Sequence, residues 1–225
     1  MDVDRRYLEP TYHVDADHPE VEAFARGEIG DAEDPRTRAV RLFYAVRDGI
    51  RYTPYGVDLS PEAMRASAVL RRGEGFCVAK SLLLTAAARA VGIPARLGFA
   101  DVRNHLASRR LLELMGGTDV FAWHSYTELF IDGRWVKATP AFDLGLCERF
   151  GVVPLEFDGR TDALFHPYDA AGRRHMEYLR DRGTYADLPL EEIRATFEEL
   201  YPRWTGTSGD LHAEAAAERA GAEGP

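Results

Sequence analysis

The most constraining feature of the sequence is a run of small and aliphatic residues from Cys77 to Val91, which directly follows the glycine-rich segment GEGF at residues 73–76. Small or apolar side chains occupy most positions of this run, so a helix formed from it is apolar on much of its surface. Such a helix must be covered by other elements. The run therefore predicts a central helix over residues 77–91, ended by Gly92, with Cys77 in its first turn.

A second strong pattern lies between residues 124 and 139, where two segments rich in aromatic and β-branched residues flank Asp132-Gly133. This dipeptide is preferred in tight type I′ turns. The pattern therefore predicts a hairpin of two antiparallel strands. His124 lies near the start of the first strand.

The rest of the chain predicts shorter elements around these two. Apolar periodicity and capping signals indicate helices at residues 35–50, 60–73, 144–151 and 189–200, and a strand at 94–102. Residues 101–120 read as an insertion with one helical stretch. We expect a single domain over residues 1–204, with core motifs at 38–143 and a C-terminal elaboration at 144–204. The tail, 205–225, has almost no large apolar residue and is expected to be disordered or weakly helical.

The charge balance and the apolar content exclude several functions. The chain has 28 basic and 37 acidic residues and a net charge of −9, which argues against nucleic acid or an anionic membrane as a partner. No stretch has the roughly 18–20 apolar residues that span a bilayer, and the start of the chain lacks the apolar segment of a signal peptide. We therefore expect a cytoplasmic protein; its oligomeric state is left open.

The two cysteines have different surroundings and are interpreted separately. Cys147 lies on the apolar side of the short helix expected at residues 144–151, which is typical of a buried structural cysteine. The seven histidines include no spacing of the kind found in zinc sites. We expect no metal and no cofactor.

Cys77 has a position that favours reactivity. A thiol in the first turn of a helix lies close to backbone N–H groups without partners in the helix and to the positive end of the helix dipole, and both favour the thiolate. The same N–H groups can stabilise an oxyanion, and His124 is a candidate base. Cys77 and His124 are therefore the candidate catalytic residues.

The order of these residues and the motifs around them resemble the transglutaminase-like superfamily of papain-related folds. The matching motifs are GFC at 75–77, AVGIPARLGF at 90–99 and HSYTELFIDGRWVKATP at 124–140. Together they cover about residues 38–143. The resemblance implies an α+β fold in which a helical layer carrying the cysteine packs on an antiparallel sheet. It also implies acyl transfer through a thioester.

One position departs from the family pattern. The family usually ends the return strand with Trp-Val-x-x-Asp-Pro, in which the Asp is the third catalytic residue, whereas this chain has Thr139 before Pro140. Asp143 has the same strand parity and is our first candidate for orienting His124, with the Thr139 hydroxyl as the alternative. Tyr52 and Tyr55 lie where the family often places cleft residues, and each either completes an oxyanion hole or packs over the core.

The expected function is cysteine-dependent hydrolysis or acyl transfer on a peptide or a small amide or ester. Hydrolysis is favoured slightly because water is always present as an acceptor. Two alternatives stay open. The absence of the family Asp-Pro motivates a catalytically inactive domain that serves as a binding or scaffold module, and a biosynthetic acyltransferase with a thioester donor is the third possibility.

Overall fold

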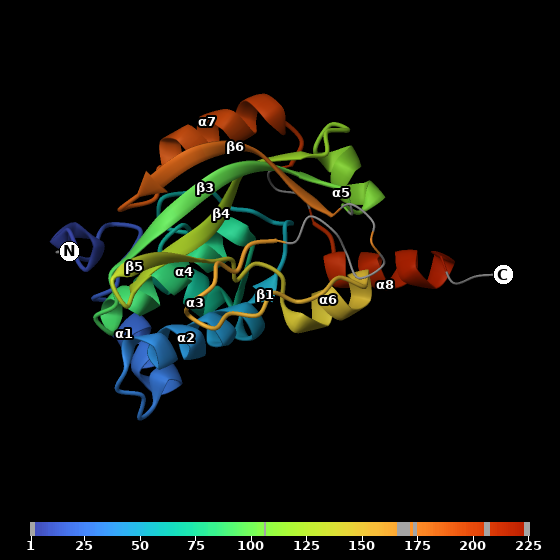
Figure 1. Cartoon of the computed structure of the whole chain (residues 1–225). Helices are drawn as coiled ribbons and strands as arrows, with labels where there is room; N and C mark the ends of the chain where they lie inside the picture. Colours follow the sequence, from blue (N-terminus) through green and yellow to red (C-terminus); the bar gives the residue numbers. More distant parts are fainter. Residues whose placement is uncertain (1–2, 106, 166–171, 173–174, 205–207, 223–225) are drawn as a thin grey trace.

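The computed structural model describes residues 3–105, 107–165, 172, 175–204 and 208–222 (Figure 1). A short 3-10 helix spans Arg5–Tyr7. The α-helices are α1 (Pro19–Ile29), α2 (Pro35–Gly49), α3 (Ala66–Arg72), α4 (Cys77–Ala90), α5 (Arg109–Leu114), α6 (Leu144–Phe150), α7 (Leu190–Leu200) and α8 (Leu211–Ala222). The strands are β1 (Arg51–Tyr52), β2 (Glu74–Gly75), β3 (Ala95–Asn104), β4 (Val120–Ile131), β5 (Arg134–Ala138) and β6 (Met176–Tyr185).

The central unit is a four-stranded antiparallel sheet with the order β5-β4-β3-β6, and α4 packs against it (Figure 1). Helices α1, α2 and α3 pack on α4, so this helix is enclosed between the sheet and a helical layer. Strands β1 and β2 form a separate parallel pair beside it. The α+β class and the helical layer carrying Cys77 are as the sequence predicts.

Helix α4 is buried because its surface has almost no polar side that water could solvate. Every residue from Val78 to Arg89 is buried. One of its few polar contacts to the sheet comes from the Thr127 hydroxyl of β4, which donates to the Ser81 carbonyl at 2.9 Å. The helix therefore holds Cys77, at its first position, in a fixed place relative to β4.

The predicted hairpin is confirmed, and its length matters for the site. Asp132 and Gly133 have φ angles of 51° and 81°, as a type I′ turn requires. Pairing between β4 and β5 extends only as far as Thr127 opposite Ala138. The first part of β4, which contains His124, therefore continues beyond the end of β5.

Strand β6 is not predicted from the sequence. It pairs antiparallel with β3 at the edge of the sheet, and most of its side chains are half-buried or exposed. An edge strand with so little buried surface lacks the alternation of apolar and polar residues that identifies a strand. Helix α1 was also missed, because it lies in a charged segment and is capped by His18.

Within the tail, for which the sequence leaves disorder or a weak helix open, Leu211–Ala222 forms helix α8. Leu211 and Ala215, four residues apart, are both buried on one side of this helix, which packs on α6. Glu214 adds a contact to Ser108, with 3.1 Å between its carboxylate and the hydroxyl. A helix that buries only two apolar residues among those described, Leu211 and Ala215, gives a weak sequence signal.

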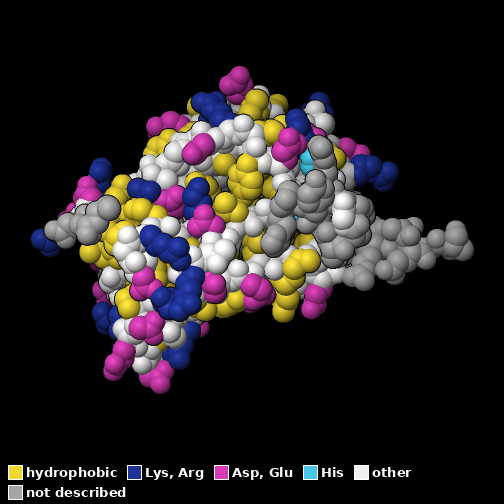
Figure 2. Space-filling view, in the orientation of Figure 1, with side chains coloured by type: hydrophobic (Ala, Val, Ile, Leu, Met, Phe, Trp, Pro, Cys, Tyr) yellow, Lys and Arg dark blue, Asp and Glu magenta, His cyan; other side chains and the backbone are white. Residues whose placement is uncertain are grey.

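On the face shown in Figure 2, basic and acidic side chains are interspersed and hydrophobic side chains gather near the middle of the molecule. Within the part of the chain that the structure describes, no helix combines the length and the apolar character needed to cross a lipid bilayer.

Lys80 of α4 is completely buried and connects two helices. Its ammonium group donates to the carbonyl oxygens of Arg47, at 2.8 Å, and Ile50, at 2.6 Å, which belong to the end of α2. Burial lowers the pKa of Lys80 from 10.5 to about 7, although the charge of Asp143 acts in the opposite direction. Two helix-end carbonyls are thus satisfied by a residue of the helix that carries Cys77.

Lys80→Met is expected to destabilise the protein by about 2–4 kcal/mol, because two buried carbonyls lose their donors. The loss of stability caused by Lys80→Met should grow with pH. Between pH 7 and 10.5 the unfolded lysine binds more protons than the folded one, so Lys80 makes the wild type more stable as pH rises, by about 2 kcal/mol from pH 7 to 9. Urea unfolding of both proteins at pH 7, 8 and 9 measures this.

Lys137→Met is the matched control, since Lys137 is only half-buried. It should leave both the stability and its pH dependence nearly unchanged. A Lys80→Met protein whose pH dependence matches that of the wild type would contradict this assignment.

Candidate active site

Cys77 is the first residue of α4 and follows Phe76, the N-cap residue. Its side chain is partly exposed. The backbone N–H groups of Ser125, Val78 and Cys77 lie where they lower the pKa of the thiol. Ser125 belongs to the part of β4 that extends beyond β5, so the end of the β4–β5 ladder leaves room for the thiol.

The protonation state of Cys77 differs from the sequence expectation of a thiolate. Burial raises the pKa of the Cys77 thiol to about 11, although the N–H groups of Ser125, Val78 and Cys77 lower it. The helix terminus does act in the predicted direction, but desolvation of the charged sulfur outweighs it. At neutral pH Cys77 is a thiol and needs a base.

His124 lies next to Ser125 on β4, opposite Ala100 of β3. It is 5% exposed, and its ring packs against that of Phe165 with 5.1 Å between centroids. Burial lowers the pKa of His124 to about 3, and the neighbouring His175 lowers it further. Its buried Nε2 atom has no hydrogen-bond partner among the described residues.

His124 is therefore a neutral imidazole at physiological pH, and one of its nitrogens can accept a proton. Ser125, whose backbone N–H lowers the pKa of the Cys77 thiol, is the chain neighbour of His124, so both candidate residues lie near the same part of β4. A neutral thiol and a neutral imidazole would react by general-base activation, in which the proton leaves the sulfur as the sulfur attacks.

The carboxylate of Asp143 has contacts other than the expected one with His124. It is the N-cap of α6 and accepts from the Leu146 N–H at 2.9 Å and from the Tyr52 N–H at 3.1 Å. His212 of α8 lies 3.4 Å from its second oxygen. An Asp directly before a helix satisfies the free N–H groups of the first turn, and this use occupies the side chain.

Thr139 directly follows β5, the strand that pairs with β4. If the β4–β5 register continued, Thr139 would be opposite Tyr126, and cross-strand partners share a face with residues two positions away, including His124. Diagonal neighbours of this kind are about 7–8 Å apart between Cα atoms. The Thr139 hydroxyl is buried and, like Nε2 of His124, has no hydrogen-bond partner among the described residues.

The two tyrosines have different places. Tyr52 is buried, packs edge-on against Phe142 at 4.9 Å, and has its pKa raised by burial and by the charges of Cys77 and Tyr55. The Tyr55 hydroxyl instead donates to Glu214 of α8. Tyr52 therefore lies near the thiol, whereas Tyr55 connects the tail helix to the body of the protein.

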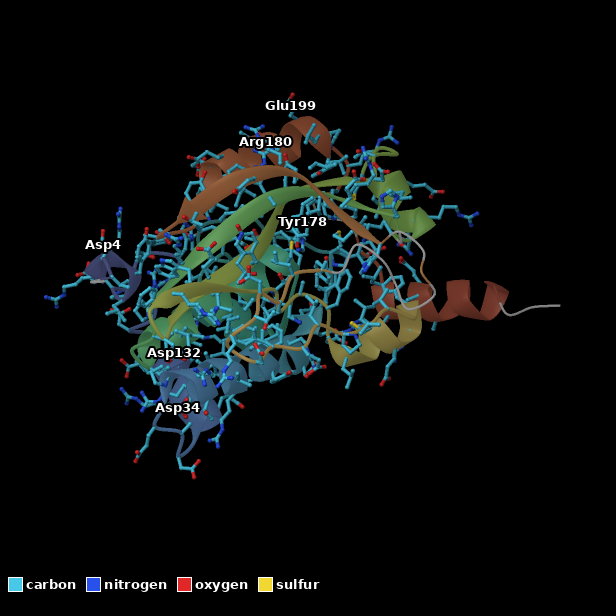
Figure 3. All side chains as sticks on the ribbon, viewed as in Figure 1. Asp4, Asp34, Asp132, Tyr178, Arg180 and Glu199 are labelled. Carbon is cyan, nitrogen blue, oxygen red and sulfur yellow. The ribbon has the colours of Figure 1, made fainter. Side chains whose placement is uncertain are left out.

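Sequence reasoning missed two residues that lie near this centre. His175 is buried beside His124 and stacks on Phe142 with 6.3 Å between ring centroids. Tyr178 belongs to β6 and is labelled near the middle of Figure 3; the residue is 39% exposed, but desolvation of its hydroxyl, followed by the charges of Tyr126 and Cys77, raises its pKa. Both come from the end of the chain around β6, the strand that had no clear sequence signal.

A narrow pocket adjoins His124. Its wall contains, with His124, the side chains of Tyr52, Val102, Asn104, Ala107, Ser108, Leu111, Phe121, Phe142, Phe150, Val152, His175, Met176 and Leu211. Among the described residues, no three His, Cys, Asp or Glu side chains are grouped so that they could hold a metal ion.

Comparison with protein families identifies the superfamily. Residues 22–140, more than half of the chain, match the family model of the transglutaminase-like superfamily. The chain belongs to this superfamily, and cysteine-based acyl transfer or hydrolysis is the chemistry of the family. No curated protein sequence matches the chain.

Three solved structures are similar at low identity. A protein from Cytophaga hutchinsonii described as a candidate cysteine protease is 17% identical, with 82% of this chain and 55% of that chain covered and a TM-score of 0.48. The periplasmic domain of TgpA from Pseudomonas aeruginosa is 18% identical, with 62% and 48% covered and a TM-score of 0.42. An arylamine N-acetyltransferase from Nocardia farcinica is 17% identical, with 87% and 74% covered and a TM-score of 0.48. The chain spans less than two thirds of the length of the first two.

Proposed function

We propose that the protein is a cysteine-dependent acyl-transfer enzyme that hydrolyses an amide or ester. Cys77 attacks the carbonyl carbon while His124 takes the thiol proton, and the carbonyl oxygen becomes an oxyanion. His124 then returns the proton to the leaving nitrogen or oxygen, which leaves a thioester on Cys77. Water, deprotonated by His124, cleaves the thioester and restores the thiol.

One observation carries the proposal: the start of α4 and the free edge of β4 meet at the sulfur of Cys77. The N–H groups of Ser125, Val78 and Cys77 lower the pKa of this thiol, so their positive ends act on the sulfur. A carbonyl oxygen bound next to the sulfur would be close to the same donors, which would stabilise the charge that develops on it. His124, adjacent to Ser125, supplies the base.

The test is the reaction of the protein with p-nitrophenyl acetate. Stopped-flow absorbance should show a burst of p-nitrophenolate approaching one per chain, followed by slower turnover, because the thioester forms faster than water cleaves it. Cys147→Ala should give the same burst, since Cys147 is buried, and burial raises the pKa of its thiol to about 12. A protein without a burst or turnover would be the inactive binding domain instead.

The same mixture distinguishes hydrolysis from transfer to an amine. Adding a primary amine should divert little of the acetyl group if water is the natural acceptor. Conversion of most of the ester into the amide at millimolar amine would assign the protein to the transferases instead.

Thr139 is our candidate for orienting His124, because its hydroxyl is buried and has no hydrogen-bond partner among the described residues, so it is available to the imidazole. Thr139→Val should lower kcat about tenfold, since it removes the hydroxyl that we propose to bond the imidazole in the reacting complex, while the base remains. Asp143→Ala should lower the free energy of unfolding by about 1–2 kcal/mol through loss of the α6 cap, with kcat within about twofold of wild type. Urea unfolding and ester turnover of both variants give the comparison.

The opposite ranking would restore Asp143 as the orienting residue. In that case Asp143→Ala loses orders of magnitude in kcat and Thr139→Val is almost unchanged. Small and equal effects of both substitutions would mean that neither side chain orients His124 and that the strand backbone holds the imidazole.

A further inference from the structure

Phe165 is an aromatic neighbour of His124 that the mechanism has not used so far. It is 7% exposed, and its ring lies 5.1 Å from that of His124 between centroids, with 48° between the two planes. Phe142 and His175 also pack on Phe165, at 4.8 and 5.7 Å between centroids. Separations of this size are those of aromatic rings in contact. Phe165 therefore contacts three rings, and the imidazole of His124 is one of them.

Backbone contacts to the sheet hold Phe165 in this place. Ala163 pairs in parallel with the end of β5: its N–H donates to the Lys137 carbonyl at 2.8 Å, and its carbonyl accepts from the Thr139 N–H at 3.0 Å. Burial raises the pKa of Tyr178 in β6, and the N–H of Phe165 lies where it lowers that pKa. The segment at residues 163–165 is thus attached to β5 and lies close to β6, the strands at the two ends of the sheet order.

His124 depends on packing for its orientation. Its buried Nε2 atom has no hydrogen-bond partner among the described residues, and the Thr139 hydroxyl is proposed to bond it in the reacting complex. Before that bond forms, the rings packed against the imidazole decide which rotamer it keeps. Water that reached the imidazole would also solvate its charged form and favour protonation, which would remove the base.

From these contacts we propose that Phe165 is a positioning residue for the base: its ring holds the imidazole of His124 and keeps water away from it. The proposal rests on the proposed function, because it concerns the group that takes the thiol proton in that reaction. Phe165 lies beyond residues 22–140, the part of the chain that matches the family model. The C-terminal elaboration therefore contributes directly to the surroundings of the base.

Burial is the main influence on the protonation of His124. It lowers the pKa of His124 to about 3, and the charge of His175 lowers this pKa further. Exposing the ring to water should therefore raise the pKa more than removing His175 would. The other described titratable groups around this cluster of rings are Tyr52 of β1, Cys77 of α4, Asp143 before α6 and Tyr178 of β6.

The test follows the ring signals of His124 by NMR from about pH 4.5 to 7.5, with His124→Gln to assign them. In the wild type these signals should not titrate in this range, because the ring stays neutral. Phe165→Ala leaves a gap that water can enter, and His124 should then titrate with a midpoint between about pH 5 and 6.5. Phe165→Leu keeps most of the bulk and should resemble the wild type.

Phe130→Ala is the matched control. Phe130 lies on the same strand as His124 but near the hairpin turn, where it packs on Trp135 with 5.3 Å between ring centroids. Its removal should leave the titration of His124 unchanged. An unchanged titration in Phe165→Ala, or a midpoint that His175→Gln raises as much as Phe165→Ala does, would overturn the role of Phe165.

A measurement on the wild type keeps the proposal testable if Phe165→Ala does not fold. Nuclear Overhauser cross-peaks should connect the ring protons of His124 with those of Phe165, because the two rings are in contact. Their absence would overturn the proposal.

Ester turnover gives the second readout. Phe165→Ala should lower kcat about tenfold with KM within about twofold, and it should move the acid limb of kcat/KM to higher pH, because the base is less well oriented and more readily protonated. Phe165→Leu should restore most of kcat. If the wild type turns over no ester at all, the proposed function fails, and the NMR titration alone then decides whether Phe165 shields His124.

Discussion

Cys77→Ser is expected to lower the turnover of any ester or amide substrate by about 10⁴-fold or more. The surroundings of Cys77 already hold its thiol protonated, so the reaction depends on a nucleophile that His124 can deprotonate during the attack. A serine hydroxyl is far less acidic and less nucleophilic than a thiol, and the same imidazole cannot compensate. Steady-state turnover and the amplitude of the p-nitrophenolate burst measure the loss.

The fold should survive this substitution, because the hydroxyl is smaller than the thiol and can accept hydrogen bonds from the same N–H groups. Far-UV circular dichroism and urea unfolding should therefore match those of the wild type within about 1 kcal/mol. Retention of even a few per cent of wild-type turnover by a folded Cys77→Ser protein would contradict the nucleophile assignment.

His124→Gln is expected to lower kcat by about 10³-fold, since a glutamine cannot take the thiol proton. The pH profile of the wild type gives an independent check. Because burial lowers the pKa of His124 to about 3, the acid limb of kcat/KM should lie well below pH 6.5. An acid limb near pH 6.5 would mean that the imidazole is more exposed to water than its 5% exposure indicates.

The same substitution should change the stability of the protein in acid. Between pH 3 and 6.5 the unfolded histidine binds a proton that the folded one excludes, so the wild type becomes less stable as pH falls through this window. The loss attributable to His124 is about 2 kcal/mol between pH 6.5 and 4.5. It should be absent from His124→Gln and present in His105→Gln, since His105 is exposed.

The sequence predicts well those parts of the fold where local pattern and burial agree. Helix α4 has apolar residues around much of its surface, and the hairpin has a turn pair that tolerates positive φ angles, so both could be predicted, although β4 begins at Val120, four residues before the predicted start. Strand β6 could not, because an exposed edge strand is defined by its hydrogen bonds to β3 and not by its side chains.

The site shows the same division. Position in the chain makes Cys77 and His124 the candidate residues. Local pattern cannot show the balance between desolvation and hydrogen bonding that raises the pKa of Cys77 and lowers that of His124. Asp143 carries a signal that was available, since an Asp before an amphipathic segment is a common helix cap. His175 gave no signal, because only the pairing of β6 with β3 brings it to the pocket.

The central claim is that a covalent thioester forms on Cys77 with His124 as the base. The most direct test is to mix the protein with p-nitrophenyl acetate, quench it in acid within the burst, and map the acetylated peptide by mass spectrometry. The account predicts one acetyl group per chain on the peptide containing Cys77, none on Cys147, and almost none in His124→Gln at the same time point. Acetylation elsewhere with Cys77 unmodified, or equal acetylation of Cys77 with and without His124, would contradict it.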